Sequence, residues 1–114
     1  MYRKLVGDQP VEWEVGGEGV RVLLPRSAAE RLEVKEVHFP KGMSESLATA
    51  VHSHADEEQA YLIVSGTGVF ASDGEETKVE KGTFLYIRRD VKHGMIPVGD
   101  EELVYLLVSC FLDS

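Results

Sequence analysis

The chain has few basic residues, almost no cysteine and no long apolar segment. Its 114 residues carry 12 Lys and Arg against 20 Asp and Glu, which gives a formal net charge of −8. A surface of that sign repels phosphate backbones and anionic lipid headgroups, so we expect neither a nucleic-acid nor a membrane partner. No apolar run reaches the ~18 residues that a membrane span needs, and the first residues lack the apolar segment of a secretion signal.

The single cysteine, Cys110, cannot form a disulfide within the chain. The protein therefore needs no oxidising compartment, and we expect it in the cytoplasm. Cys110 lies in the apolar run Leu103–Leu112, where a cysteine behaves as a small buried hydrophobe rather than as a reactive thiol.

Helical patterns and fixed-period repeats are also missing, and short alternating segments take their place. Hydrophobic residues make up 43% of the chain and charged residues 28%, which is ordinary for one globular domain over residues 1–114. Turn signals such as Asp73-Gly74 recur roughly every 8 to 12 residues, which indicates an all-β sandwich or barrel. The expected strands are 11–15, 20–24, 32–39, 60–65, 68–72, 77–80, 83–88 and 103–112.

The segment from His52 to Gly66 carries the strongest chemical pattern. His52 and His54 are two residues apart, so on an extended chain both imidazoles point to the same side. Gln59 and Tyr61 share one face of the strand that follows. This arrangement is typical of a metal site built on strands, although a solvated acidic turn with two surface histidines is the alternative.

A second segment begins at Gly82, continues through a strand and ends at His93. With both segments in view, the chain resembles the cupin superfamily. The first cupin motif has a His-x-His pair, an acid and a glycine, and the second runs from a glycine through a turn to a histidine. His52, His54 and Gly66 match the first motif, at about residues 52–66. Gly82 and His93 match the second, at about residues 82–97.

The resemblance implies a single-domain double-stranded β-helix, which is a jelly-roll-like barrel. It also implies that His52, His54, Gln59 and His93 hold one divalent transition metal ion, such as Fe, Ni, Mn, Cu or Zn. Gln59 stands where most of the family carries Glu, and it is either a ligand or a hydrogen-bond partner of one. Glu58 could replace it under a shorter spacing, but Glu58 would point to the opposite face of the strand.

The second motif departs from the family pattern at three positions. Arg88 and Asp90 stand where a proline and a glycine shape the turn of most members, and Pro97 replaces an asparagine.

Four further residues are candidates for contact with a substrate. Tyr61 could donate a proton or a hydrogen bond as a catalytic residue, or it could pack in the core. Tyr86, Arg88 and His38 could bind a substrate, with the arginine suited to a carboxylate or phosphate. The alternatives are a solvated charge for Arg88 and an ordinary strand histidine for His38.

The resemblance favours a metal-dependent enzyme acting on a small organic molecule, of dioxygenase, isomerase or lyase type. The alternative is a non-catalytic small-molecule binding or sensor protein, although no DNA-binding segment accompanies the domain. The resemblance also implies a homodimer, because small cupins commonly pair through their N-terminal strands, and Val11 and Trp13 are expected at an edge of the sheet or at such a dimer surface. The acid runs 56–58 and 100–102 are expected in exposed loops.

Overall fold

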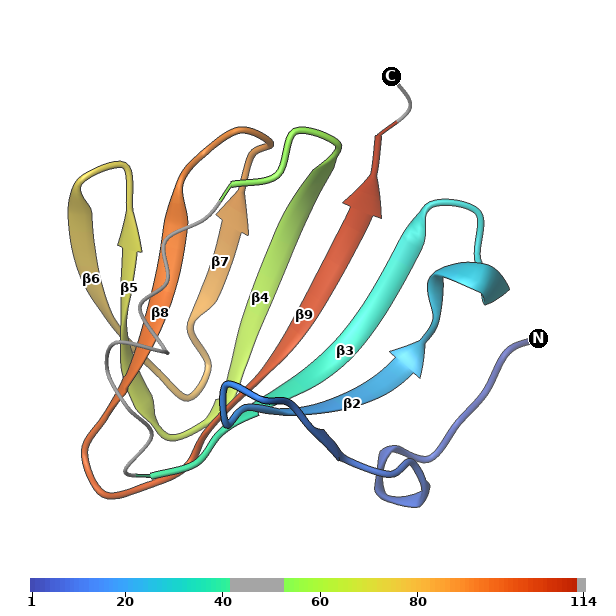
Figure 1. The fold of residues 1–114 in the computed structure, drawn as a ribbon, viewed down its shortest axis with the longest axis horizontal. Coiled ribbons are helices and arrows are strands. Elements are labelled where there is room, and N and C mark those ends of the chain that lie inside the picture. The colour runs from blue at the N-terminus through green and yellow to red at the C-terminus, as the bar shows by residue number, and fades with distance from the viewer. Residues whose placement is uncertain (42–52, 113–114) are drawn as a thin grey trace.

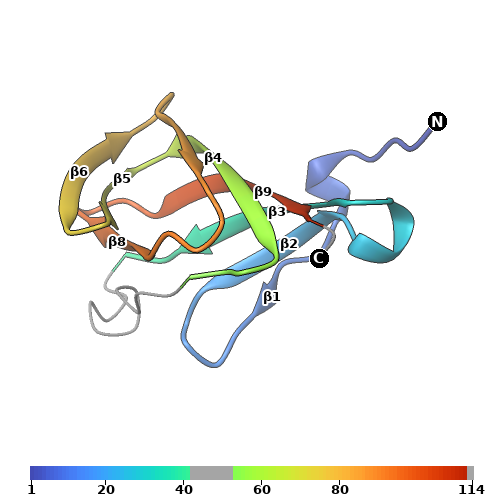
Figure 2. The ribbon, with the colours of Figure 1, turned by 90° about the horizontal axis from the view of Figure 1, so that it is seen from above.

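The structure is a computed structural model that describes residues 1–41 and 53–112 of the chain. Its strands form two antiparallel sheets, a six-stranded sheet in the order β1-β2-β3-β9-β4-β7 and a three-stranded sheet in the order β6-β5-β8 (Figure 1). Seen from above, the two sheets enclose a barrel, and β2 and β3 extend beyond it (Figure 2). The all-β prediction is confirmed. The elements are η1 (Val6–Asp8), β1 (Glu12–Trp13), β2 (Gly19–Leu24), η2 (Arg26–Ala28), β3 (Leu32–Phe39), β4 (Glu57–Ser65), β5 (Thr67–Ser72), β6 (Glu75–Glu80), β7 (Phe84–Ile87), β8 (His93–Val98) and β9 (Leu103–Phe111).

The inner face of the six-stranded sheet supplies much of the core. β9 pairs with both β3 and β4, so Tyr105 lies opposite Val37 on one side and Ile63 on the other. Residues that pair across a sheet point to the same side, and all three belong to the buried core. We call the side of the sheet that carries Val37, Ile63 and Tyr105 the inner face, and the opposite side the outer face.

Gly66 occupies the sharp turn between β4 and β5. Its φ angle is 81°, and a Cβ atom there would lie 2.3 Å from the backbone oxygen of Glu102. Both the backbone angle and the contact require glycine, because a side chain would have to displace backbone atoms. The glycine of the first motif is therefore a packing requirement of the barrel.

Two predicted features differ from the structure. β8 was not among the expected strands, because Gly94 and Pro97 interrupt its pattern; Pro97 is accommodated because β8 lies at an edge of the small sheet. The first predicted strand is reduced to β1, whose two residues are exposed rather than half-buried. Within the described residues no strand lies beyond β1 to cover Trp13, which remains 59% exposed.

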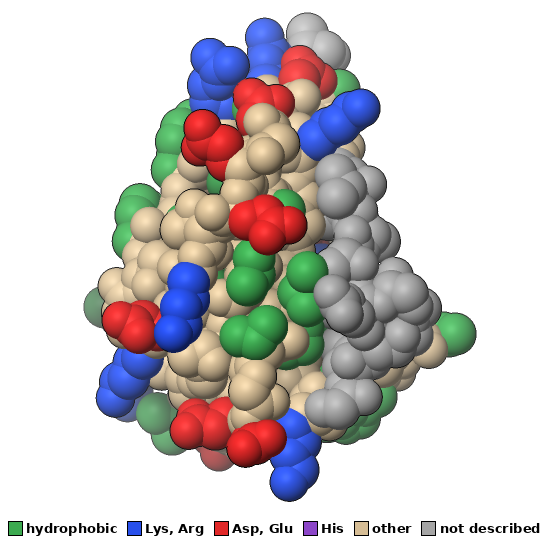
Figure 3. Space-filling model, turned by 90° about the vertical axis from the view of Figure 1, so that its left-hand side faces the viewer, with side chains coloured by type: hydrophobic (Ala, Val, Ile, Leu, Met, Phe, Trp, Pro, Cys, Tyr) green, Lys and Arg blue, Asp and Glu red, His purple; other side chains and the backbone are tan. Residues whose placement is uncertain are grey.

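Part of the outer face of the six-stranded sheet, over β4, β9 and β7, is apolar and accessible. Leu62 pairs with both Leu106 and Phe84, which places side chains of β4, β9 and β7 side by side. The exposed hydrophobic side chains on this face are Leu32, Leu62, Val64, Phe84 and Tyr86. By comparison, the side of the molecule that carries the small sheet shows charged side chains around a small hydrophobic group (Figure 3).

None of the helices in the described ranges has the length and apolar character that a membrane span requires.

Candidate functional site

Polar side chains are buried on the inner face where β4 begins. Glu57, Gln59 and Tyr61 alternate with outward residues along the strand, and each is less than a tenth exposed. The Gln59 amide donates to the Glu57 carboxylate and to the Ser109 hydroxyl, each at 3.3 Å. Its oxygen accepts from the Tyr61 hydroxyl at 3.0 Å. These bonds fix the orientation of the amide, because donors and acceptors on both of its ends are satisfied.

Two histidines lie beside this group and are oriented by their Nδ1 atoms. His54 Nδ1 is 3.1 Å from the Glu57 carboxylate. His93 Nδ1 is 2.9 Å from the carbonyl oxygen of Val91. The centroids of the two imidazole rings are 5.5 Å apart. When Nδ1 carries the proton toward a carboxylate or carbonyl, Nε2 becomes the nitrogen suited to a metal, so both rings have the support that is typical of metal-ligating histidines.

A backbone hydrogen bond joins the two motifs. The amide of Asp90 donates to the carbonyl oxygen of His54 at 2.8 Å, so the turn before His93 is attached to the segment that carries the first histidines. Asp90 adopts a φ of 67° in this turn. Aspartate tolerates the left-handed conformation better than most residues. It can therefore form the turn for which most of the family uses glycine.

Tyr61 is surrounded by aromatic rings at the base of the site. Its ring stacks on Tyr105 at 5.2 Å and meets Phe70 edge to face at 5.5 Å, both measured between centroids. Burial, and secondarily the charge of Glu57, raises the pKa of Tyr61 far above its ordinary value. Its hydroxyl therefore stays protonated and donates to Gln59. The structure shows both a core role and a polar contact for this residue.

The four predicted metal ligands are only partly covered by the described residues. His52 lies outside them, so its position relative to the other three is not described. Gln59 and His93 are buried and His54 is half-buried. Within residues 1–41 and 53–112, no group of three or more His, Cys, Asp or Glu residues is arranged to hold a metal ion. Two oriented imidazoles and an amide oxygen nevertheless form a donor set that suits a borderline divalent ion once a further ligand joins it.

The predicted substrate contacts Tyr86 and Arg88 lie outside this group. Both alternate with the buried Ile87, and Tyr86 donates a hydrogen bond of 2.6 Å to Glu58 on the outer side. The outward direction predicted for Glu58 is thereby confirmed. Arg88 is exposed and lines a surface hollow with Arg89.

His38 is also directed away from Gln59. It alternates on β3 with the core residues Val37 and Phe39, and its ring bridges two carboxylates. Its Nε2 lies 2.6 Å from Glu36, and its Nδ1 lies 3.0 Å from Glu102. The contact of His38 with a substrate stays a prediction.

Sequence reasoning missed two members of the site. Glu57 was assigned to an exposed acidic loop, but it begins β4 and is 8% exposed, so that assignment was wrong. The two-residue spacing that joins Gln59 to Tyr61 also includes Glu57 and could have identified it. Ser109 gave no such signal, because β9 enters the site only through its pairing with β4.

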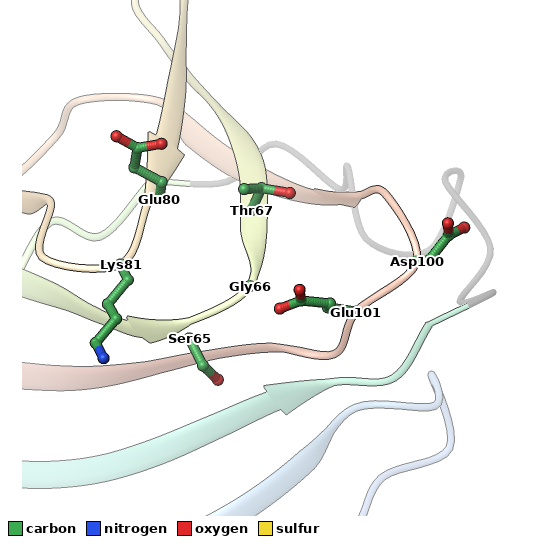
Figure 4. Close-up of a pocket in the computed structure, with 7 residues that line it drawn as sticks. All are labelled: Ser65, Gly66, Thr67, Glu80, Lys81, Asp100 and Glu101. Carbon is green, nitrogen blue, oxygen red and sulfur yellow. The ribbon is translucent and has the colours of Figure 1, made fainter.

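Among the described residues, the opposite end of the barrel has a different lining. A surface hollow there is lined by the β4–β5 turn and by the loops after β6 and β8 (Figure 4). Its charged side chains are Glu80, Lys81, Asp100 and Glu101, and none of its lining residues is a histidine. His54 and His93 therefore lie with the buried Glu57, Gln59 and Ser109 at the end where β4 begins, whereas His38 lies toward the opposite end beside Glu102.

Comparison with known proteins agrees with this geometry. The family model described as the cupin domain matches residues 35–109. An uncharacterized protein of Methanocaldococcus jannaschii is 32% identical in an alignment 88 positions long, which covers 67% of this chain and 70% of that protein. A structure described as a predicted oxalate decarboxylase from Thermotoga maritima superimposes with a TM-score of 0.83 at 20% identity, over 95% of this chain and 97% of that one.

The Streptomyces protein PAC13, solved with uridine, superimposes with a TM-score of 0.74 at 14% identity, over 100% of this chain and 85% of that one. Structural likeness at such identities shows the fold alone. The family model, however, spans both histidine motifs and every strand from β4 to β8. On that evidence the chain belongs to the cupin family.

Proposed function

We propose that the protein is a metal-dependent enzyme acting on a small organic molecule. His52, His54, Gln59 and His93 would hold one divalent transition metal ion. The observation that supports this proposal is the orientation of both described imidazoles, whose Nδ1 atoms lie 3.1 Å from the Glu57 carboxylate and 2.9 Å from the Val91 carbonyl oxygen, as is typical of metal-ligating histidines. Cupins commonly bind metals, and the donor set fits Fe, Ni, Mn, Cu or Zn.

A bound divalent ion would supply Lewis acidity toward substrate oxygen atoms. The chain's own residues orient the ligands and hold one proton on the Tyr61 hydroxyl. Glu57 holds the ring of His54 and the amide of Gln59, while Tyr61 keeps its proton and directs it to the Gln59 oxygen. Dioxygenase, isomerase and lyase chemistry are all compatible with such a site, because a fold does not fix a reaction.

The first experiment is elemental analysis of the purified, chelator-free protein, with metal counted per chain. We expect about one equivalent of a single transition metal, because one set of four donors binds one ion. Alanine at His52, His54 or His93 should remove it while the circular dichroism spectrum stays that of a folded barrel. His38→Ala is the matched control, because His38 lies on the outer face. Full retention of metal in the first three variants contradicts the site.

Gln59→Glu tests the fourth ligand. A carboxylate adds a negative charge to the site, so divalent-metal affinity should rise roughly tenfold or more. Competition with a fluorescent chelator measures the change. Unaltered affinity would show that Gln59 supports the ligands without touching the metal.

A non-catalytic small-molecule binding or sensor protein is the second candidate. It is favoured by the neutral Gln59, which stands where most cupins carry a carboxylate. If the purified protein contains no metal and takes up none on reconstitution, this second candidate replaces the first.

We also propose that the partner of the chain is a second copy of itself. The support is the apolar outer face, where Phe84 is 65% exposed and Leu62 41% exposed beside the half-buried Leu106. A two-fold interface places the same patch on both subunits, so a flat apolar sheet face is self-complementary. This differs from the predicted pairing through Val11 and Trp13. The cytoplasmic location stays a prediction.

A further inference from the structure

The inner face of β3 changes character along its length. Residues 33, 35, 37 and 39 share this face; Val37 and Phe39 are buried in the core, but Glu33 and Lys35 are charged. The Lys35 ammonium lies 3.1 Å from the Glu33 carboxylate. The Lys35 side chain is 34% exposed and the Glu33 side chain 23% exposed. Such a partly exposed pair contributes little to stability, so its inward direction needs another explanation.

The register of the sheet places this pair beside the candidate site. Glu33 pairs with Ser109, which pairs with Gln59, so these three residues form one row across the inner face. Lys35 lies in the next row with Leu107 and Tyr61. β3 and β4 are two strand spacings apart, or about 10 Å. A lysine side chain spans much of that distance, so a small molecule at Gln59 would come within reach of its ammonium group.

We infer that Lys35 binds an anionic oxygen group, such as a carboxylate, at the end of the substrate that is distant from His54 and His93. This inference rests on the proposed function and specifies its substrate class as a small anionic molecule. Glu33 holds the ammonium in position before binding and competes with the incoming anion. An incoming group has to displace the Glu33 carboxylate from the Lys35 ammonium. The ion pair therefore selects molecules that carry a carboxylate of their own.

The two residues make opposite contributions, which gives the inference a distinctive signature. Removing Lys35 deletes the charge-assisted hydrogen bond to the anion. Neutralising Glu33 removes the competitor and leaves the ammonium available. Lys35→Met should therefore weaken anion binding, whereas Glu33→Gln should strengthen it.

Succinate and succinamate serve as probes, because they have the same length and differ by one negative charge. Isothermal titration calorimetry on the metal-loaded protein should show succinate binding roughly tenfold more tightly, as expected for a hydrogen bond to a charged group. Lys35→Met should bring the two affinities within about twofold of each other, and Glu33→Gln should raise succinate affinity about threefold. Lys78→Met is the matched control, because Lys78 is an exposed lysine on β6, and it should keep the wild-type preference.

An unchanged preference in Lys35→Met, or equal affinity for both probes in the wild type, overturns the inference. Metal content is measured in the same samples and should not change in Lys35→Met. If the protein holds its metal but binds both probes equally, only the anion site is contradicted. If the protein holds no metal, the proposed enzyme is contradicted, and the same titration still decides the role of Lys35.

Discussion

Each face of the six-stranded sheet departs locally from the usual pattern of a half-solvated antiparallel sheet. The inner face, which should be apolar, also buries the polar residues Glu57, Gln59 and Ser109 near the start of β4. The outer face, which should be polar, exposes Phe84 and Leu62. Buried polar groups and exposed apolar patches are the two departures that carry information about function. The comparison supports the two proposals made above, a ligand site on the inner face and self-association through the outer face.

Neighbouring residues on β4 provide the largest test of this difference. Ile63 is 1% exposed on the inner face, and Leu62 is 41% exposed on the outer face. Ile63→Ala should lower the free energy of unfolding by about 2–5 kcal/mol, because it leaves a cavity in the core. Leu62→Ala should cost less than about 1 kcal/mol in dilute protein. Urea denaturation measures both, and equal losses would remove the distinction between the faces.

A charge on the outer face tests its role in association. Phe84→Glu should weaken dimerisation by about a hundredfold, because it places an unpaired carboxylate in the apolar centre of the contact. Sedimentation equilibrium over a range of concentrations gives the dissociation constant. Thr77→Glu, an exposed position on β6, is the control and should leave the mass unchanged. A wild-type protein that is monomeric at all concentrations contradicts the dimer.

Glu57 and Glu58 are neighbours in sequence but point to opposite faces of the sheet. Replacing each of them in turn therefore tests the two faces with nearly identical substitutions. Glu57→Gln should lower metal affinity roughly tenfold, because it removes the charge that orients His54. Glu58→Gln should have little effect, since Glu58 contacts Tyr86 on the outer side. Chelator competition measures the affinity of both variants. Equal metal affinities in the two variants would show that Glu57 does not support the metal ligands.

The smallest expected effect concerns two tyrosines on opposite faces. Burial raises the pKa of Tyr61, whereas its unfolded side chain ionises near pH 10. Above about pH 10 the unfolded state therefore binds fewer protons than the folded state, and stability falls as the pH rises toward the folded pKa. Tyr61→Phe should reduce the loss between about pH 9 and 11 by roughly 1 kcal/mol.

The hydrogen bond to Glu58 raises the pKa of Tyr86 as well, but this side chain is exposed on the outer face. Tyr86→Phe is therefore the control for Tyr61→Phe, and it should leave the alkaline loss of stability nearly intact. Urea midpoints at both pH values measure the two variants. Similar behaviour of both would argue against a protonated, buried Tyr61.

Local patterns predicted the fold because each of them reports on a short stretch of chain. Alternation located β3, a nearly continuous apolar run located β9, and the two-residue period correctly placed Gln59 and Tyr61 on one face. The same rule applied two residues earlier would have found Glu57. β8 was missed because Gly94 and Pro97 disfavour a strand in general, although an edge position tolerates them.

Sequence by itself determined most of the strands, the shared face of Gln59 and Tyr61, and the family motifs around Gly66 and Gly82. Only the tertiary structure decided which faces meet. Ser109 bonds to Gln59 across 50 residues, and Glu33 joins their row through β9. The outward positions of His38 and Tyr86 likewise follow from strand pairing. The physical reason is that side-chain alternation fixes direction within a strand, whereas register between distant strands depends on how the whole barrel packs.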